Sequence, residues 1–415
     1  MVRIKPFKGL RPTPEHAADV ASPPYDVLSS EEAREMARTN PNSFLHVVKP
    51  EIDLPPETDH YSDEVYNKAA ENLKKLRSDG IVKQDSEDSY YLYQIQMGAH
   101  VQTGLVAVTS VDDYLENRVK KHEFTRPVKE DDRTRHIFTS GAQAGPVFCI
   151  FRSDPDLRKT FDKIISAEPE VNFIADDGVR HTLWPVCDKK LTSAITDAFA
   201  KFDSIYIADG HHRSAAGSRA AIQLREKNPN YSGDEEYNYF LTVIFPDDEM
   251  RIMAYHRVVK DLNGMPEDQF FNRINERFEV EKADSATDAE PSKPYEYAMF
   301  MDGQWYRLTA NNDGIDLSDP VESLDVQVLS REVLQPLLGI EDPRTDPRID
   351  FVGGIRGLGE LEKLVNSGEW KVAFALHPTT VEQLLRVADA NKVMPPKSTW
   401  FEPKLRSGMV VHLID

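Results

Sequence analysis

Alternating apolar and polar positions predict a chain in which strands and helices are interleaved. Runs rich in β-branched and aromatic residues, typical of strands, cover 90–96, 101–111, 145–151, 179–186, 204–208 and 239–245. Helical periodicity is found at 61–79, 153–165 and 189–200. Because strands and helices do not follow one another as a strict repeat, the pattern predicts an α+β or mixed α/β fold.

A change in composition divides the later part of the chain. The stretch KADSATDAEPSKP at 282–294 lacks apolar periodicity and is typical of a loop or linker. Residues 253–259, before it, are expected to pair with 239–245 across the turn at 246–248. The elements expected after it are a hairpin at 295–308, helices at 326–338 and 381–390, and strands at 372–376 and 409–413. We therefore predict an N-terminal α/β segment (1–85) that contributes to the site, a central domain (86–281) and a C-terminal α/β domain (295–415) with a lid-like loop.

Polar residues are concentrated directly after one predicted strand. The strand at 204–208 runs into Asp209-Gly210-His211-His212-Arg213, and an alanine-rich helix begins there. The N-terminus of a helix favours anions, and the small residues from Ser214 onward allow a ligand to approach. We predict that Gly210, His211, His212, Arg213 and Ser214 bind phosphate. The alternative is an ordinary Asp-Gly turn with Asp209 as the helix cap and both histidines in structural roles.

A second charged stretch, at 119–136, contains a candidate general base. Glu123 lies between His122 and Phe124, surroundings that orient a carboxylate and alter its basicity. Arg133, further along, offers a cation for phosphate. The alternative is a solvated helix and loop with weak surface ion pairs.

Four further residues are secondary candidates. Tyr25 and Asp26 lie on a loop stiffened by two prolines, before a helix expected to begin at Ser29 or Ser30 with Glu32 nearby and to run through about residue 38. His256 is expected on a sheet edge. Lys397 lies in the proline-rich loop near the C-terminus, from which it could reach a phosphate. For each of them a purely structural role is the alternative.

The amino-acid composition argues against some classes of function. The 415 residues carry a net charge of −20, which argues against a protein that binds duplex nucleic acid. Two cysteines without metal-binding spacing fit a reducing cytoplasm. Because the chain has no apolar stretch of membrane-spanning length, we expect no membrane association.

Several motifs support a family resemblance. They are Pro24-Tyr25-Asp26-Val27, His122-Glu123-Phe124-Thr125, the charged run 129–133, the DGHHR turn at 209–213, His256-Arg257-Val258-Val259 and the segment 394–399. In this order they resemble domain of unknown function family 1015. The DGHHR turn, with a His-Glu pair upstream, also resembles the ParB/sulfiredoxin-like superfamily, and within it the free serine kinases. The second resemblance implies that the central part is a ParB/sulfiredoxin-like phosphate-binding domain and that ATP or ADP binds there with Mg²⁺.

This resemblance implies a kinase that transfers a phosphoryl group from a nucleotide to a free amino acid, most simply L-serine, yielding O-phospho-L-serine. Glu123 would take the hydroxyl proton, Asp209 would hold Mg²⁺ or fix the loop, and Lys397 would neutralise transferred charge. His211 and His212 are further catalytic candidates, and the substrate candidates are Tyr25, Asp26, His122 and His256. The partners would be nucleotide and amino acid, with a homodimer as a possible assembly. Two alternatives stay open: a non-catalytic nucleotide-binding switch, and a phosphohydrolase that uses His211 or His212.

Overall fold

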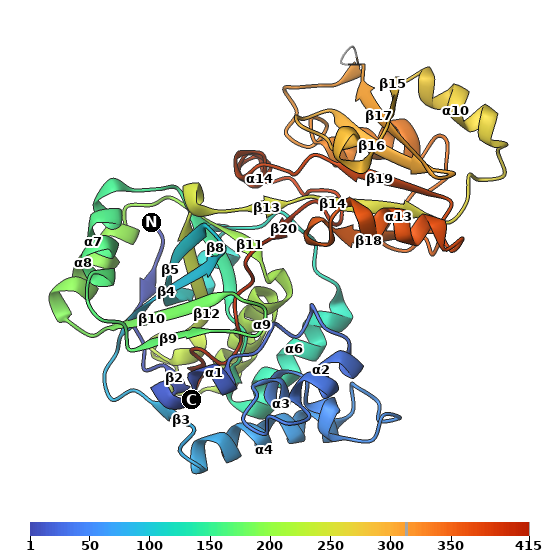
Figure 1. Ribbon diagram of the computed structural model, residues 1–415. Coiled ribbons are helices and arrows are strands. Elements are labelled where there is room, and N and C mark those ends of the chain that lie inside the picture. The colour runs from blue at the N-terminus through green and yellow to red at the C-terminus, as the bar shows by residue number, and fades with distance from the viewer. Residues whose placement is uncertain (312–313, 415) are drawn as a thin grey trace. The chain divides into compact units, whose positions relative to one another are not determined.

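The computed structural model describes residues 1–311 and 314–414 and divides the chain into two compact units. Unit 1 comprises residues 1–250 and 403–415, and unit 2 comprises residues 251–402. Both units combine helices with sheets, which confirms the predicted α+β class (Figure 1). This division does not follow the three predicted segments, because residues 1–85 pack within unit 1 and the composition change at 282–294 lies inside unit 2.

Unit 1 is built on a mixed sheet with the strand order β6-β11-β8-β12-β5-β4-β10-β9, and β1 pairs with β5 beyond the end of β4. The pairs β11–β6 and β12–β8 are parallel, and the others are antiparallel. The strands of this sheet are β1 (Ile4–Lys5), β4 (Tyr90–Met97), β5 (His100–Ser110), β6 (Val119–Lys120), β8 (Val147–Phe151), β9 (Val171–Ile174), β10 (Arg180–Val186), β11 (Ile205–Asp209) and β12 (Tyr239–Pro246). Two small pairs, β2 (Leu10–Pro12) with β3 (Val82–Gln84) and β7 (Ala142–Gln143) with β21 (His412–Leu413), complete the strands of this unit.

Helices cover this sheet and extend it. The α-helices of unit 1 are α1 (Ala17–Val20), α2 (Ser30–Ala37), α3 (Leu45–Val48), α4 (Asp63–Ser78), α5 (Val111–Leu115), α6 (Pro127–Ser140), α7 (Pro155–Ile165), α8 (Lys189–Phe199) and α9 (His211–Lys227). The 3₁₀ turns are η1 (Pro14–His16), η2 (Pro50–Asp53), η3 (Glu236–Asn238) and η4 (Asp247–Glu249). Apolar residues of α7 and α8, among them Phe161 and Phe199, pack with Leu92 of β4 and Cys149 of β8 in one buried cluster. Such burial is the main favourable contribution to folding.

The first 85 residues share a core with later parts of unit 1. Phe44, Leu45 and Leu73 pack with Ala144 and Val411 in a second cluster. The predicted helix start is confirmed: the Ser29 side chain accepts the Glu32 N–H while the Glu32 carboxylate accepts the Ser29 N–H, a capping box. The N-terminal segment is thus joined to the rest of unit 1 by buried apolar contacts between residues far apart in sequence.

Unit 2 contains an antiparallel sheet with the order β15-β17-β16-β19-β14-β18. Its strands are β14 (Tyr255–Val259), β15 (Phe278–Ala283), β16 (Glu296–Met301), β17 (Gln304–Ala310), β18 (Ile349–Gly353) and β19 (Val372–Leu376). A separate pair joins β13 (Ile252–Met253) and β20 (Trp400–Phe401). The helical elements are α10 (Glu267–Asn275), α11 (Ala286–Ala289), α12 (Asp325–Leu329), the π-helical turn η6 (Ser330–Leu334), η7 (Gly354–Arg356), α13 (Leu358–Asn366) and α14 (Val381–Asp389). The predicted hairpin at 295–308 is confirmed as β16–β17.

The predicted pairing of 253–259 with 239–245 is wrong. Strand β12 pairs with β5 on one edge and with β8 on the other, so it has no free edge to offer. The segment 255–259 is β14, which pairs with β18 and β19 inside unit 2. His256 therefore lies within a sheet and not on an edge.

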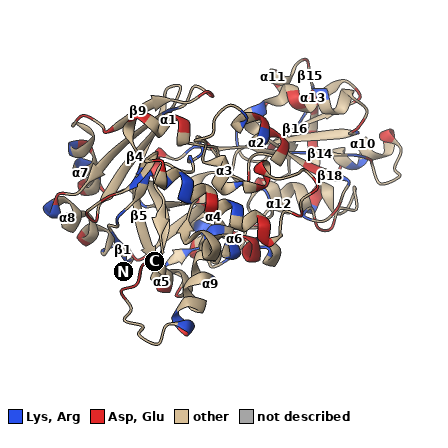
Figure 2. Ribbon diagram, turned by 90° about the horizontal axis from the view of Figure 1, so that it is seen from below, with Lys and Arg blue, Asp and Glu red and all other residues tan. Residues whose placement is uncertain are grey.

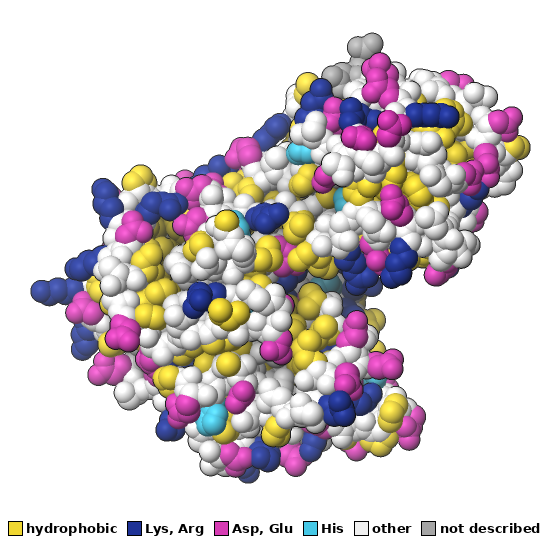
Figure 3. Space-filling view, viewed as in Figure 1, with side chains coloured by type: hydrophobic (Ala, Val, Ile, Leu, Met, Phe, Trp, Pro, Cys, Tyr) yellow, Lys and Arg dark blue, Asp and Glu magenta, His cyan; other side chains and the backbone are white. Residues whose placement is uncertain are grey.

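Charged side chains of both signs are interspersed on the surface. Lys, Arg, Asp and Glu occur close together over α4 and α6 (Figure 2), and the face drawn in Figure 3 carries mixed charges. Within residues 1–311 and 314–414, every helix is too short or too polar to cross a membrane.

Candidate active site

The DGHHR turn joins β11 to α9 through a glycine in left-handed conformation. Gly210 has φ 92° and ψ 29°, a region that glycine adopts without steric cost. A Cβ there would lie 3.4 Å from the Arg213 guanidinium and 3.4 Å from the Val147 Cα. The N-cap residue of α9 is Gly210, which has no side chain to cap the first turn. The N–H groups of Arg213 and Ser214 bond to the Gly210 carbonyl, so within the described residues the N–H groups of His211 and His212 are left for another acceptor. This part of the turn has the properties of an anion site.

Asp209, at the end of β11, is held by two donors. Its Oδ1 accepts the N–H of Gly210 at 2.8 Å, and its Oδ2 accepts the Lys404 ammonium at 3.0 Å. Burial opposes ionisation, but the nearby charges of Lys404 and Arg213 outweigh it and hold the pKa of this carboxyl below its usual range. Our sequence reasoning missed Lys404, and no local signal marks it, because it follows Asp209 by 195 residues.

Arg213 connects the turn to the loop of Tyr25 and Asp26. Its side chain is only 8% exposed, its Nη2 donates to Asp26 Oδ2 at 3.0 Å, and its Nη1 donates to the Pro146 carbonyl at 2.5 Å. Burial lowers the pKa of this guanidinium, but Asp26 and Asp209 outweigh that effect and raise it above its usual value. Arg213 is thus a fixed positive charge beside the first turn of α9.

The two histidines of the turn hold a loop by accepting hydrogen bonds. His211 Nε2 accepts the backbone N–H of His122 at 3.5 Å, and His212 Nε2 accepts that of Arg126 at 3.0 Å. The segment between these contacts, which we call loop 122–126, is therefore attached at both ends to the start of α9. Only a neutral imidazole has an acceptor nitrogen.

The pKa values of both histidines agree with neutral rings. Burial, followed by repulsion from His122, lowers the pKa of His211 well below its usual value. Burial and then Arg126 lower the pKa of His212. The acceptor nitrogens face loop 122–126, so the groups that this turn offers to an anion are backbone N–H groups. A phosphate contact by either imidazole stays a prediction.

Glu123 projects from loop 122–126 beside the turn. Its Oε2 lies 3.7 Å from His211 Nδ1, and its side chain is 51% exposed. Since His211 Nε2 accepts a hydrogen bond, we assign the ring proton to Nδ1, which faces the carboxylate. The neighbouring His122 ring is buried and meets the His211 ring edge-on, with centroids 4.5 Å apart, and burial lowers the pKa of His122 to about 4. A carboxylate accessible to a ligand is thereby placed at the start of α9.

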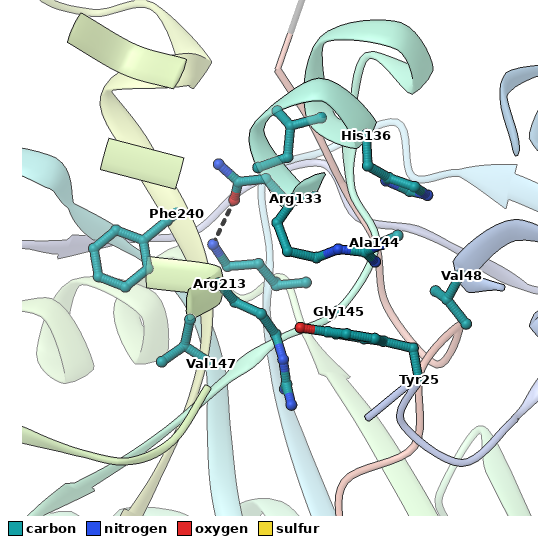
Figure 4. A pocket seen from close by; sticks show the side chains of 12 residues that line it. Tyr25, Val48, Arg133, His136, Ala144, Gly145, Val147, Arg213 and Phe240 are labelled. Atoms are coloured by element: carbon teal, nitrogen blue, oxygen red, sulfur yellow. Dashed lines mark hydrogen bonds between the residues drawn. The ribbon is translucent and has the colours of Figure 1, made fainter. Parts of the chain in front are cut away.

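Tyr25, Arg133 and Arg213 line a cavity of about 40 Å³ behind the turn (Figure 4). The Arg133 guanidinium lies 4.2 Å from the centre of the Tyr25 ring, and that of Arg213 lies 5.8 Å from it. Burial raises the pKa of the Tyr25 hydroxyl. The Ser214 hydroxyl, predicted to contact phosphate, is buried and donates to the His211 carbonyl at 2.9 Å.

Two predicted site residues belong to unit 2. His256 is buried, burial lowers its pKa to about 4, and its Nδ1 accepts the Leu376 N–H at 3.3 Å. Lys397 adopts a left-handed backbone with φ 58°, and its ammonium lies 5.4 Å from the Tyr255 ring centre. Their contribution to the site stays a prediction, whereas unit 1 brings Tyr25, Asp26, His122, Glu123, Arg133 and residues 209–214 together.

The predicted Mg²⁺ ligand does not have the surroundings of one. Both oxygens of Asp209 accept hydrogen bonds, one from a lysine ammonium. Among the described residues, no group of three or more His, Cys, Asp or Glu is arranged to hold a metal ion. These contacts fit the alternative role, in which Asp209 fixes the loop.

Comparisons with known proteins give one family and several distant structural likenesses. The family model described as "Protein of unknown function (DUF1015)" matches residues 4–327. No curated protein matches the chain.

Three solved structures represent the structural likenesses. A free serine kinase in complex with AMP is 14% identical, with 74% of this chain and 91% of that chain covered and a TM-score of 0.36. A conserved hypothetical protein from Pyrococcus furiosus is 15% identical, covering 75% and 95%, with a TM-score of 0.35. SbnI with C-terminal truncation from Staphylococcus aureus is 9% identical, covering 74% and 87%, with a TM-score of 0.38. These TM-scores are too low to assign a shared fold or function.

Proposed function

Because the chain belongs to the DUF1015 family, whose description assigns no reaction, we propose from its own site that it is a nucleotide-dependent kinase for the hydroxyl group of a free amino acid. The proposed donor is ATP or ADP, and the proposed acceptor is L-serine. The anion site at the turn supports a phosphate-containing donor. The resemblance of the DGHHR turn to free serine kinases supports both the nucleotide as donor and L-serine as acceptor.

The observation that supports this proposal most is the uncapped start of α9 beside a fixed positive charge. Leading N–H groups, the helix dipole and the Arg213 guanidinium all favour an anion at the same place. The Gly210 hydrogen atoms leave room where a Cβ would meet that guanidinium. A terminal phosphate of a nucleotide is an anion of this kind, and phosphoryl transfer depends largely on positioning and charge neutralisation.

Glu123 supplies the remaining group that the reaction requires. In the proposed step the serine hydroxyl oxygen forms a bond to the terminal phosphorus, the bond from that phosphorus to the bridging oxygen breaks, and the shortened nucleotide leaves. The hydroxyl proton passes to the Glu123 carboxylate. His211 orients this carboxylate through Nδ1–H, and His122 keeps loop 122–126 attached by donating to His211 Nε2.

The geometry supports a kinase more than a histidine-dependent phosphohydrolase. The two ring nitrogens of His211 face Glu123 and the His122 N–H, and His212 Nε2 accepts the Arg126 N–H. Three of the four ring nitrogens are thus already directed at protein groups. A non-catalytic nucleotide switch has the same anion site but would not need an exposed carboxylate beside it.

Phosphorus NMR of the purified protein with L-serine, Mg²⁺ and either ATP or ADP tests the proposal. We expect a phosphomonoester signal that requires serine and is lost in Glu123→Gln, because the amide cannot take up the proton. Nucleotide affinity should be unchanged in this variant. Glu116→Gln is the matched control, since Glu116 has a similarly exposed side chain (55%) and pairs with Arg118. Serine-independent loss of nucleotide, or full turnover by Glu123→Gln, would contradict the proposal.

A further inference from the structure

The cavity behind the turn contains a buried hydrogen-bond donor without a partner. It is enclosed by α6, α9, the start of β8, β12 and the loop that carries Tyr25. Arg213 Nε is fully buried and has no hydrogen-bond partner in the described chain. Arg133, which also lines the cavity, directs Nε and Nη2 at Asp132 Oδ2, at 3.0 and 2.9 Å, so Nη1 is not part of this pair. A buried donor without an acceptor is costly, which indicates that a ligand completes this cavity.

Glycine leaves space beside the unused donor of Arg213. A Cβ at Gly145, which lines the cavity, would lie 3.4 Å from Arg213 Cδ and 3.9 Å from its Nε. The guanidinium of Arg133 lies over the Tyr25 ring, and Tyr25 extends toward Arg213 (Figure 4). Tyr25 thus holds both cations at one small cavity.

The charges and walls of the cavity limit the class of ligand. Asp26 and Asp132 already pair with the two arginines, so the surroundings suit a single negative charge better than a phosphate dianion. Burial, followed by Arg133, lowers the pKa of His136 to about 4 and leaves it neutral. Gln143 also lines the cavity, and its amide is already used, because its oxygen accepts the Leu241 N–H and its nitrogen donates to the Tyr239 carbonyl. The remaining side chains of the walls are apolar. A cavity of about 40 Å³ accommodates two to four water-sized groups, enough for a carboxylate but not for a nucleotide.

We propose that this cavity binds the carboxylate of a small free acid, with Arg213 Nε–H and Arg133 Nη1–H as donors. On the proposed function, this acid is the acceptor amino acid. Because the Arg213 guanidinium also borders Gly210, a carboxylate held here lies next to the turn that binds the donor phosphates. The kinase would then require a free carboxylate on its acceptor as well as a hydroxyl.

Ligand-observed NMR with the 415-residue protein, with and without AMP, tests the cavity independently of turnover. We expect L-serine and L-alanine to bind with similar affinity and L-serinamide, which lacks the carboxylate, to bind about tenfold more weakly or worse, the loss typical of a charge-assisted hydrogen bond. Gly145→Ala keeps both arginines but places a methyl beside Nε, so it should weaken serine binding about tenfold. Gly359→Ala, at a position with open space around it, is its control.

Arg133→Gln should weaken serine binding to a similar degree, while Arg135→Gln on the same helix, whose side chain is 43% exposed and paired with Asp63, should not. A circular dichroism spectrum and a urea unfolding midpoint close to those of the wild type verify that each variant is folded. Equal binding of serinamide and serine, no amino-acid binding, or serine binding unaffected by both cavity variants would overturn the proposal.

The two proposals fail in different ways. If phosphoserine forms but neither cavity variant alters the KM for serine, the kinase proposal stands and the cavity proposal is refuted. If the wild type binds the carboxylate but forms no phosphoserine, and both variants lose this binding, the cavity proposal stands and the kinase proposal is refuted.

Discussion

Replacing Arg213 with methionine removes the charge that links the turn to the Asp26 loop. The substitution keeps most of the buried side-chain volume but loses the hydrogen bonds to Asp26 Oδ2 and to the Pro146 carbonyl. Breaking a buried ion pair by removing one partner typically costs about 3–5 kcal/mol. Because the Asp26 side chain is 37% exposed and regains water, we expect a smaller loss of unfolding free energy, about 2–3 kcal/mol.

Arg219→Met is the matched control for this substitution. Arg219 also lies on α9 and pairs with an aspartate, Asp131, at 2.5 Å, but the two side chains are 43% and 54% exposed. Exposed pairs of this kind contribute about 1 kcal/mol or less. Urea unfolding of both variants, monitored by circular dichroism, measures the difference. Equal losses in the two variants would refute the buried placement of Arg213.

Nucleotide binding gives a second, independent measurement on Arg213→Met. The guanidinium acts at the turn mainly through its charge, since its two Nη groups are already bonded. Loss of this charge should weaken nucleotide binding about tenfold, equivalent to about 1.4 kcal/mol. The substitution at Arg219 should leave it unchanged. Calorimetric titration that gives wild-type affinity for Arg213→Met would remove the turn from the proposed binding site.

Two further predictions concern the turn and the buried histidines. Gly210→Ala should lower stability by about 1–2 kcal/mol through its positive φ. It should also weaken nucleotide binding, because its Cβ would fill the space in contact with the Arg213 guanidinium, at 3.4 Å, where the phosphate is proposed to bind. Gly233→Ala, at φ 96° in open space, should lower stability alone, and equal nucleotide affinities of the two variants would contradict the steric argument. His136 has a folded-state pKa of about 4, so the unfolded chain binds its proton first as the pH falls. The unfolding free energy should then decrease by about 1.4 kcal/mol per pH unit as the pH falls from the usual histidine pKa to pH 4. His136→Gln should remove this contribution, whereas the control His60→Gln, at an exposed position, should leave it unchanged. Denaturant unfolding over a pH series checks this, and an unchanged slope in His136→Gln would contradict it.

The sequence was most informative where neighbours along the chain determine the conformation. The strand, glycine and helix around 204–214 follow from periodicity and from a single left-handed residue, and the capping box at Ser29 follows from side chains three residues apart. The hairpin at 295–308 is similar, because Asp302 and Gly303 form its tight turn. In each case the stabilising contacts are local and therefore visible in residue order.

Contacts between segments far apart in the chain could not be predicted from the sequence in the same way. The pairing of Lys404 with Asp209 depends on the chain returning to unit 1 at residue 403 after 152 residues of unit 2. The choice of neighbours for β12 likewise depends on β5 and β8 occupying both of its edges. Alternation predicted the strands themselves, but their partners are selected by long-range packing, which single-chain patterns do not encode.

The two histidines of the turn illustrate why residue type alone does not assign a role. Beside an anion site, an imidazole is readily interpreted as a donor or a cation, yet both rings accept a backbone N–H from loop 122–126. Acceptance requires a neutral ring, so in the proposed function the charge that attracts phosphate comes from Arg213 and the start of α9. Protonation would remove both acceptors and detach the loop that carries Glu123. The lowered pKa values of His211 and His212 therefore keep the candidate base in place at neutral pH.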